Sequence, residues 1–240
     1  MTSIATKPSG SKYLLKRFYQ KTIGRFAPGY EQELERAVGD CRTLLDVGCG
    51  AYSPIKSFSA QSKQRLDATG VDAFGPSIER SRADGIHNYY VQMDILKIAE
   101  RFAPTRPGAR HFECVLASDV IEHLPKEDGY KLLDQMESIA GKRVVVFTPN
   151  GFVRQGEYDK NPWQVHRSGW TRAEFEQRGY RVIGIGGLKR LKGEYGAIRF
   201  WPTRVWYVIA DLTQRFVRGR PEHAYQLLAV KEMRPTPTVS

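Results

Sequence analysis

The chain has 240 residues, of which 41% are hydrophobic and 26% are charged, values that are ordinary for a globular protein with a sizeable core. Its 37 basic and 26 acidic residues give a net charge of +11, which favours anionic partners such as nucleic acid, phosphorylated small molecules or an anionic membrane. The N-terminal residues lack the apolar segment of a signal peptide, and the longest apolar run near the C-terminus, residues 205–210, is too short to span a bilayer.

The cysteines favour a reducing compartment. Cys41, Cys49 and Cys114 are odd in number and lack the spacing of a metal site, so we interpret them as reduced, buried thiols. We therefore expect a cytoplasmic protein. Association with a membrane stays open because of a basic segment near the C-terminus, described below.

Residues 1–40 are predicted to form a tail and capping helices ahead of the main domain. Residues 1–11 are polar and are predicted to be disordered. Helical spacing of apolar residues predicts a helix over residues 12–23, and a second short helix is predicted over residues 30–38. These helices either pack over the mouth of a site or cover an edge of the sheet.

Residues 41–240 are predicted to form one domain in which strands alternate with helices. The predicted strands cover residues 43–47, 68–72, 89–93, 112–118, 144–147, 181–185 and 225–230. Helices are predicted from Pro54, over residues 77–82 and 126–140, and from Thr171, where Glu174 completes a capping box. This alternation predicts a doubly wound α/β fold with a mostly parallel sheet.

A basic and aromatic insertion, residues 188–220, separates the last two predicted strands. It carries eight Lys or Arg residues against Glu194 and Asp211, and its apolar residues from Val205 to Phe216 follow helical spacing. Three interpretations fit this composition: a helix that caps a substrate pocket, a helix that lies on an anionic membrane, or a nucleic-acid surface.

Residues 44–50, Leu-Leu-Asp-Val-Gly-Cys-Gly, are typical of a buried strand that runs into a glycine turn. Gly48 and Gly50 lack a Cβ, so they permit positive φ and let a ligand approach the bare backbone. Such turns bind nucleotides in many doubly wound sheets, although a turn that binds nothing has the same pattern. Asp72 ends the next strand 22 residues after Gly50, a spacing typical of a carboxylate that binds ribose hydroxyls.

With these motifs, the chain resembles the class I S-adenosylmethionine-dependent methyltransferases over about residues 43–185. The matching segments are residues 44–50, Gly70-Val71-Asp72, Met93-Asp94-Ile95, residues 119–125 and Thr148-Pro149-Asn150. The resemblance implies a Rossmann-like seven-stranded sheet whose last strand is antiparallel, S-adenosylmethionine as cofactor, and methyl transfer as the activity. Tyr52 replaces the family's frequent third glycine, which argues against a dinucleotide pyrophosphate more than against S-adenosylmethionine.

The resemblance also implies a set of cofactor-binding residues at the ends of successive strands. Gly48 and Gly50 are expected against the methionine part, with Ser118 and Asp119 near its amino group and the sulfonium. Asp72 is expected at the ribose, and Asp94 and Ile95 at the adenine. The cofactor-binding set also includes Asp46 and Ala73.

Candidate catalytic residues follow the fourth strand. Asp119, Glu122 and His123 lie at i, i+3 and i+4, so a helical turn would place them on one face, and His166 lies in a later polar loop. This pattern resembles metal-dependent O-methyltransferases, including the small-RNA 2′-O-methyltransferases and the ubiquinone-pathway enzymes. That resemblance implies a divalent ion on Asp119, Glu122, His123 and His166. Metal-free relatives share the motif, however, and we favour His123 or His166 as a base without metal, beside Asp119.

The predicted function is O-methylation of a small-molecule, sugar or lipid-linked hydroxyl. Two alternatives stay open: a metal-dependent RNA 2′-O-methyltransferase, and a non-enzymatic module that binds a membrane or a partner. Trp163 and Trp170, which flank His166, either line the acceptor pocket or anchor a long loop. Arg154 and Arg167 either contact an acidic substrate or are solvated. The remaining histidines, His87, His111 and His223, are interpreted as surface or loop residues.

Overall fold

The computed structural model describes residues 28–59, 66–104, 112–157, 161–193 and 196–233. The predicted N-terminal tail and the predicted helix over residues 12–23 lie outside the described residues, as does His111.

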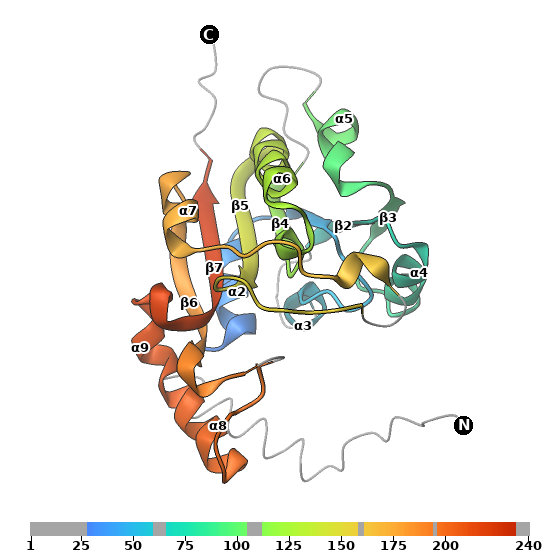
Figure 1. The fold of residues 1–240 in the computed structure, drawn as a ribbon. Helices are drawn as coiled ribbons and strands as arrows, with labels where there is room; N and C mark the ends of the chain where they lie inside the picture. Colours follow the sequence, from blue (N-terminus) through green and yellow to red (C-terminus); the bar gives the residue numbers. More distant parts are fainter. Residues whose placement is uncertain (1–27, 60–65, 105–111, 158–160, 194–195, 234–240) are drawn as a thin grey trace, which may run out of the picture.

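The described chain forms one seven-stranded sheet with the strand order β3-β2-β1-β4-β5-β7-β6 (Figure 1). Its strands are β1 (Thr43–Val47), β2 (Asp67–Asp72), β3 (Tyr89–Gln92), β4 (Phe112–Ser118), β5 (Ala140–Pro149), β6 (Arg181–Leu188) and β7 (Ala224–Glu232). β1 to β5 pair in parallel, whereas β7 inserts between β5 and β6 and is antiparallel to both. The predicted Rossmann-like sheet with an antiparallel last strand is therefore confirmed.

Helices cover both faces of this sheet. They are α2 (Tyr30–Val38), α3 (Ile55–Ser59), α4 (Gly75–Ala83), α5 (Ile98–Phe102), α6 (Lys126–Ile139), α7 (Arg172–Gln177), α8 (Thr203–Leu212) and α9 (Gln214–Arg218). Because side chains alternate along a strand, Leu45 faces the core beneath α5, α6 and α7, whereas Leu44 faces the core beneath α2 and α3. The sheet therefore has a hydrophobic core on each face, and these two cores fix the positions of the strand ends.

The predicted element boundaries are close to those observed, with three instructive differences. β5 begins at Ala140, directly after α6, because Ala140 and Arg143 pair with neighbouring strands although residues 140–143 are not an apolar run. β6 continues to Leu188 through a bulge at Gly186 and Gly187, both of which have positive φ. The sequence did not indicate α5 because a helix of five residues is too short to show a period.

α2 lies on the sheet face rather than on its edge, and it also reaches the ends of the strands. Leu34 and Val38 belong to the core that contains Phe147 of β5. At the first residue of the helix, the Tyr30 ring stacks on Phe147 with centroids 4.0 Å apart, and its hydroxyl hydrogen-bonds Ser118 Oγ at 2.6 Å. α2 therefore ties one core to the end of β4.

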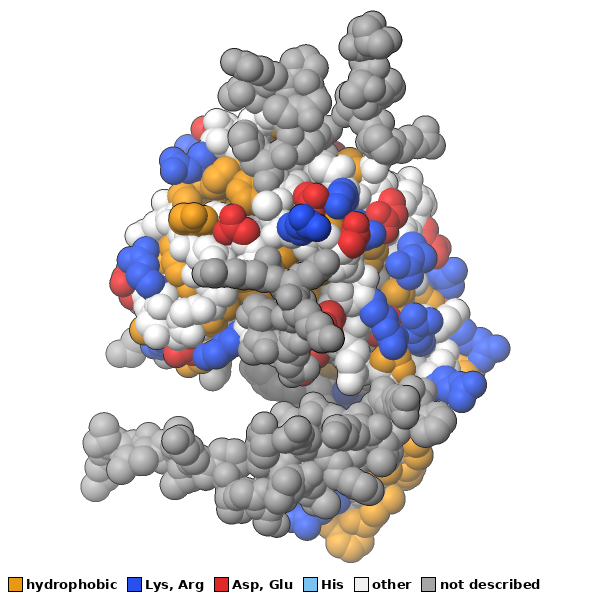
Figure 2. All heavy atoms as spheres, turned by 180° about the vertical axis from the view of Figure 1, so that it is seen from behind, with side chains coloured by type: hydrophobic (Ala, Val, Ile, Leu, Met, Phe, Trp, Pro, Cys, Tyr) orange, Lys and Arg blue, Asp and Glu red, His pale blue; other side chains and the backbone are white. Residues whose placement is uncertain are grey.

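The predicted helix in the insertion is present as α8, which lies at one end of the molecule against β6 (Figure 1). Hydrophobic and basic side chains gather at that end of the surface (Figure 2). Among the helices of the described residues, none combines the length and the apolar character that crossing a membrane requires. The three cysteines are buried and unbridged, as predicted.

Candidate active site

The glycine turn after β1 has two glycines with different surroundings. Gly48 and Gly50 both have positive φ, +68° and +56°. A Cβ on Gly48 would lie 2.6 Å from a methyl group of Val120, so packing excludes a side chain there. A Cβ on Gly50 would meet nothing nearer than a backbone oxygen at 4.0 Å. Gly50 therefore leaves bare backbone beside open space, where a ligand can approach closely.

Asp72 is held next to this turn by backbone donors. The Gly50 N–H donates to Asp72 Oδ2 at 2.9 Å, and the Phe74 N–H donates to Asp72 Oδ1 at 2.7 Å. Burial raises the pKa of Asp72, and the two N–H groups oppose that rise. The carboxylate keeps lone pairs on both oxygens, so it is oriented and still able to accept from hydroxyl groups.

Asp46 lies beneath the turn and is only 2% exposed. Its Oδ2 accepts from Ser53 Oγ at 2.5 Å and from His87 Nε2 at 2.8 Å. These bonds connect the end of β1 to the segments before α3 and β3. The partners of the Asp46 carboxylate are thus side chains inside the protein, so Asp46 stabilises the segments around the end of β1.

His87 lies in the loop between α4 and β3, as interpreted, but it is buried and not on the surface. Its side chain is 0% exposed and its Nε2 is bonded to Asp46. It fits because Gly70 of β2 has no side chain: a Cβ there would come within 3.1 Å of the imidazole. A histidine in a loop carries no periodic signal, so only the fold reveals this contact.

The other predicted cofactor residues lie along the same edge of the sheet. Asp94 is exposed and caps the short 3-10 helix Ile95–Lys97, its Oδ1 accepting from the Leu96 N–H at 2.9 Å. Ala73 follows Asp72 and its carbonyl accepts from Gln92 Nε2 at 3.2 Å. Ser118 ends β4 and is bonded to Tyr30, as described above. Gly50, Asp72 and Asp94 thus offer open backbone and two carboxylates, which fit an adenosyl group with hydroxyl and amino donors.

Asp119 follows β4 in an unusual conformation. Its φ is +52°, the one positive φ of a non-glycine residue in the described chain, and its N–H donates to the Phe147 carbonyl at 2.9 Å. The next turn is a 3-10 helix, Ile121–His123, and it begins only after Val120. Asp119 therefore lies outside the turn that holds Glu122 and His123, which differs from the predicted single helical face.

Glu122, His123 and His166 come together although they lie far apart in the sequence. One ligand atom from each lies within 4.8 Å of the others, and the two imidazole rings meet edge to face with centroids 4.8 Å apart. Thr148 Oγ1 donates to Glu122 Oε2 at 2.9 Å. In the described residues, Glu122 Oε1 and His123 Nδ1 are buried without a hydrogen-bond partner. Buried polar atoms of this kind are rare and favour a ligand or an ion beside them.

Burial changes the protonation of this group. It raises the pKa of Asp119 to about 7 and raises the pKa of Glu122 well above its usual range, with the nearby Asp119 adding to the second effect. Burial lowers the pKa of His123 to about 4, and proximity to His166 contributes. It also lowers the pKa of His166. Both imidazoles are therefore neutral at neutral pH.

The tautomer of His166 follows from its hydrogen bond. Its Nδ1 lies 2.6 Å from the Val153 carbonyl oxygen, which can only accept, so Nδ1 carries the proton. Nε2 then keeps its lone pair. The same loop is fixed further by the N–H groups of Arg167 and Ser168, which donate to the Glu122 carbonyl at 2.8 and 3.0 Å.

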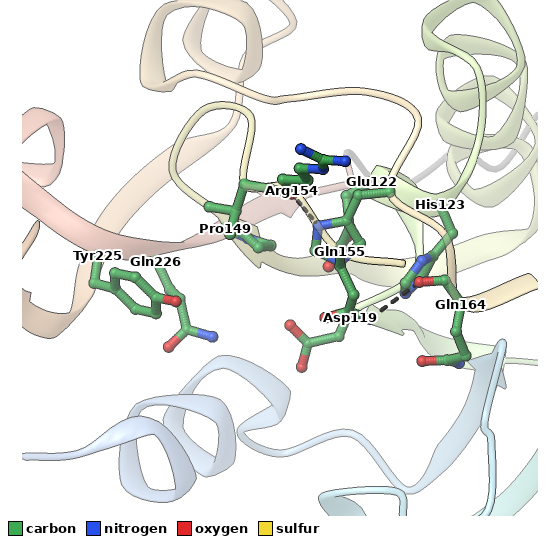
Figure 3. Close-up of a pocket in the computed structure, with 11 residues that line it drawn as sticks. Asp119, Glu122, His123, Pro149, Arg154, Gln155, Gln164, Tyr225 and Gln226 are labelled. Carbon is green, nitrogen blue, oxygen red and sulfur yellow. Dashed lines mark hydrogen bonds between the residues drawn. The ribbon is translucent and has the colours of Figure 1, made fainter. Parts of the chain in front are cut away.

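These side chains line a cavity of about 410 Å³ at the ends of β4 and β5 (Figure 3). Its lining residues are Asp119, Glu122, His123, Pro149, Val153, Arg154, Gln155, Gln164, His166, Tyr225 and Gln226. Tyr225 and Gln226 lie opposite Asp119 and Gln164 across the cavity (Figure 3). The sequence did not indicate these two residues because only the insertion of β7 beside β5 brings them here.

The two tryptophans that flank His166 in the sequence differ in burial: Trp170 is in the core and Trp163 is on the surface. Trp170 is 0% exposed and packs on Phe175 and Tyr130 in the core, so it anchors the loop. Trp163 is exposed and does not line the cavity. Arg154 lines it, whereas Arg167 is exposed and does not. In the described part of the insertion, residues 188–193 and 196–220, no residue lines this cavity.

The fold and the site define a methyltransferase, and comparison with known proteins agrees. The family described as "Methyltransferase domain" matches residues 12–191, so this chain belongs to that family. The resemblance to class I S-adenosylmethionine-dependent methyltransferases is therefore confirmed. A search of curated proteins gives no significant match.

Solved structures with the same fold include methyltransferases of different kinds. The methyltransferase domain of the bacterial CtHen1-C is 16% identical, with a TM-score of 0.52 over 89% of this chain and 97% of that one. The plantazolicin methyltransferase BpumL in complex with SAH is 16% identical, with a TM-score of 0.51 over 95% and 92%. A SAM-dependent methyltransferase from Archaeoglobus fulgidus is 18% identical, with a TM-score of 0.50 over 92% and 99%. Identities this low show a shared fold alone.

Proposed function

We propose that the chain transfers the methyl group of S-adenosylmethionine to a hydroxyl of a small molecule, a sugar or a lipid-linked precursor, with His166 as general base. The single observation that carries this proposal is the fixed tautomer of His166, which leaves a lone pair on Nε2, in a residue that lines the cavity together with Asp119. A cavity of about 410 Å³ lies within the size range of small-molecule sites. Cytoplasmic activity is part of the proposal.

The cofactor occupies the ends of β1, β2 and β3 in this proposal. Asp72 accepts from both ribose hydroxyls, because Gly50 and Phe74 already fix the orientation of its carboxylate. Asp94 accepts from the adenine amino group, and Ile95 lies beside it. Gly48 and Gly50 face the methionine part, and Ser118 and Asp119 lie toward its amino group and the sulfonium. Asp46 and Ala73 contribute indirectly. Asp46 bonds to Ser53 and His87, and the Ala73 carbonyl accepts from Gln92.

Methyl transfer to a hydroxyl requires two things of the protein: alignment of the acceptor with the methyl group, and removal of the hydroxyl proton. S-adenosylmethionine supplies a methyl group on a sulfonium, and its transfer to oxygen is an in-line displacement that leaves a neutral thioether. The chain's residues align the acceptor with that methyl group and exclude water from it. His166 Nε2 takes the proton that the acceptor hydroxyl loses, and the Val153 carbonyl holds the resulting imidazolium in place through Nδ1–H.

The test separates cofactor binding from proton removal. Isothermal titration with S-adenosylhomocysteine measures binding, and transfer of a labelled methyl group to a panel of phenols and sugars measures activity. We expect His166→Asn to bind the cofactor product as the wild type does and to lose transfer. No binding of S-adenosylhomocysteine by the wild type would contradict the assignment of the cofactor site, and undiminished transfer by His166→Asn would contradict the base.

A second candidate function is metal-dependent 2′-O-methylation of RNA. Two unpartnered buried atoms, Glu122 Oε1 and His123 Nδ1, favour it, together with the net charge of +11. Glu122, His123 and His166 would hold the ion with Asp119 nearby, and a bound ion lowers the pKa of a coordinated hydroxyl. Activity that survives a chelator, with no salt-dependent binding of RNA, would remove this candidate. Loss of transfer on chelation, restored by Mn²⁺ or Mg²⁺, would favour it over the metal-free base.

A further inference from the structure

The described surface concentrates its exposed hydrophobic side chains in one short segment. Eleven large hydrophobic residues are exposed, and seven of them lie between residues 200 and 216. These seven are Phe200, Trp201, Val205, Tyr207, Val208, Leu212 and Phe216. Trp201 is 88% exposed, the highest value among the eleven. Clustered apolar exposure of this kind marks an interaction surface, whereas single exposed residues need no explanation.

α8 contacts the sheet along a narrow line only. Ala210 is its one buried residue in the structure, and a Cβ on Gly187 of β6 would lie 2.3 Å from the Ala210 carbonyl oxygen. The absence of a side chain at Gly187 thus lets the helix backbone approach the strand. Trp206 and Ile209 are half-buried. Four further apolar residues, Val205, Tyr207, Val208 and Leu212, are exposed, although a helix so rich in apolar residues is normally buried. We define the α8 face as the seven exposed residues named above.

Basic side chains border the α8 face. A cavity of about 340 Å³ next to it is lined by Leu188, Lys189, Arg190, Arg199, Glu222 and His223. Its one acid, Glu222, is already paired with Arg172 at 2.9 Å. The cavity and the face are continuous, because the His223 ring stacks on Phe216 with centroids 6.1 Å apart. The Arg220 guanidinium also lies 4.4 Å from the Phe216 ring centre.

We propose that the α8 face docks on an anionic lipid bilayer. Its aromatic and aliphatic side chains enter the boundary between headgroups and acyl chains, and the exposed Arg190 and Arg199 of the neighbouring cavity face lipid phosphates. Aromatic residues on one side with Lys and Arg at the border are the features of helices that lie in a membrane interface. Figure 2 shows orange hydrophobic and blue basic side chains next to each other at this end of the molecule.

The charge of the chain distinguishes this partner from a second copy of itself. Residues 188–220 contain eight basic residues and two acidic ones, in a chain of net charge +11. Two copies docked through this face would bring like charges together, whereas an anionic bilayer attracts them. The proposal is independent of the proposed acceptor and of His166, because no residue of the α8 face lines the methyltransferase cavity.

Vesicle cosedimentation of the full chain tests this proposal. The vesicles contain either phosphatidylcholine alone or phosphatidylcholine mixed with phosphatidylglycerol. We expect binding to the mixed vesicles, weakened by salt, and little binding to phosphatidylcholine alone. The double variant Trp201→Ser and Val205→Ser should bind at least about tenfold more weakly, because each lost side chain removes apolar burial. Arg190→Gln with Arg199→Gln should reduce the preference for anionic vesicles.

Tyr89→Ser is the matched control, because Tyr89 is 62% exposed on β3, at the opposite edge of the sheet. It should bind mixed vesicles as the wild type does. Absence of wild-type binding overturns the proposal. Equal binding to both vesicle types, or an equal loss in the Tyr89 variant, also overturns it. Analytical ultracentrifugation measures whether the chain forms a dimer. If the wild type formed a dimer, the double variant Trp201→Ser and Val205→Ser abolished it, and no vesicle binding was seen, the α8 face would be assigned to a second copy of the chain instead.

Discussion

The two halves of the site are built from the sequence in different ways. Around β1, β2 and β3, the residues proposed to bind the cofactor follow strand ends directly, and backbone N–H groups orient Asp72. Around β4, β5 and β7, the cavity is lined by side chains from residue 119 to residue 226, held by a long loop. Local geometry therefore fixes the first half, whereas the second half depends on the whole fold. Changes in the two halves should separate cofactor binding from methyl transfer.

The largest expected effect is on methyl transfer, from the acceptor half. His166→Asn removes the lone pair of Nε2, and we expect transfer to fall by about 10²- to 10⁴-fold, the range typical of a lost general base. Affinity for S-adenosylhomocysteine should stay within about twofold, because the cofactor half is untouched. Arg167→Gln is the control, since Arg167 is exposed in the same loop and does not line the cavity. If His166→Asn also bound S-adenosylhomocysteine much more weakly, cofactor binding and methyl transfer would not be separable. That result would contradict the division of the site into two halves.

The next effect is on cofactor affinity, from the cofactor half. Asp72→Ala removes the acceptor for the ribose hydroxyls, and we expect S-adenosylhomocysteine to bind about 100-fold more weakly, as the loss of two charge-assisted hydrogen bonds predicts. Isothermal titration measures the change. Asp67→Asn, an exposed acid at the start of the same strand, should bind as the wild type does. Equal affinity in Asp72→Ala and Asp67→Asn would exclude Asp72 from the ribose site.

A third prediction concerns stability beneath the cofactor half. His87→Leu leaves the buried Asp46 carboxylate without one of its two side-chain donors. We expect the free energy of unfolding to fall by about 2 kcal/mol, the cost of an unsatisfied buried polar group. Chemical denaturation measures it, with the exposed His223→Leu as reference. Equal stability of the two variants would show that the Asp46–His87 bond contributes nothing.

The smallest effect is on the pH dependence of cofactor binding. Burial raises the pKa of Asp72, and the ribose needs its carboxylate form, so affinity should fall on acidification at a pH above the usual range of an aspartate, about 4. The effect of the same group on the stability of the free protein has the opposite sign: affinity for the cofactor rises with pH, whereas stability falls. Because the folded state binds this proton more tightly, Asp72 lowers the stability of the free protein as the pH rises through the raised value.

Titration calorimetry of S-adenosylhomocysteine from neutral to acidic pH measures the effect on binding, and Asp72→Asn is the comparison. That variant should bind weakly and show no decline with acidification from this group. A decline of the same size in Asp72→Asn would assign the titration to another residue.

The difference between the two halves also explains what the sequence could predict. The glycine turn, Asp72 and Asp94 each follow a strand that the apolar pattern predicts, so their positions along the sheet edge followed from the strand order. Tyr225 and Gln226 gave no signal, because their place depends on β7 pairing with β5. The buried bond from His87 to Asp46 depends on the missing side chain of Gly70, and the separation of Asp119 from the turn at Glu122 depends on one positive φ.

The same reasoning applies to the insertion. Helical spacing predicted α8, but composition alone left three interpretations open and favoured the pocket lid over a membrane helix and a nucleic-acid surface. The structure adds that the exposed apolar residues of α8 lie away from the cavity and next to basic side chains. That placement, which no local pattern contains, is the basis for the proposed lipid surface.

The most direct test of this account is a crystal structure of the chain with S-adenosylhomocysteine. The account predicts the ribose hydroxyls within hydrogen-bond distance of Asp72, the adenine amino group at Asp94, and the sulfur facing the cavity that His166 lines. A nucleoside bound elsewhere, or side chains that fill the space above Gly50, would contradict it.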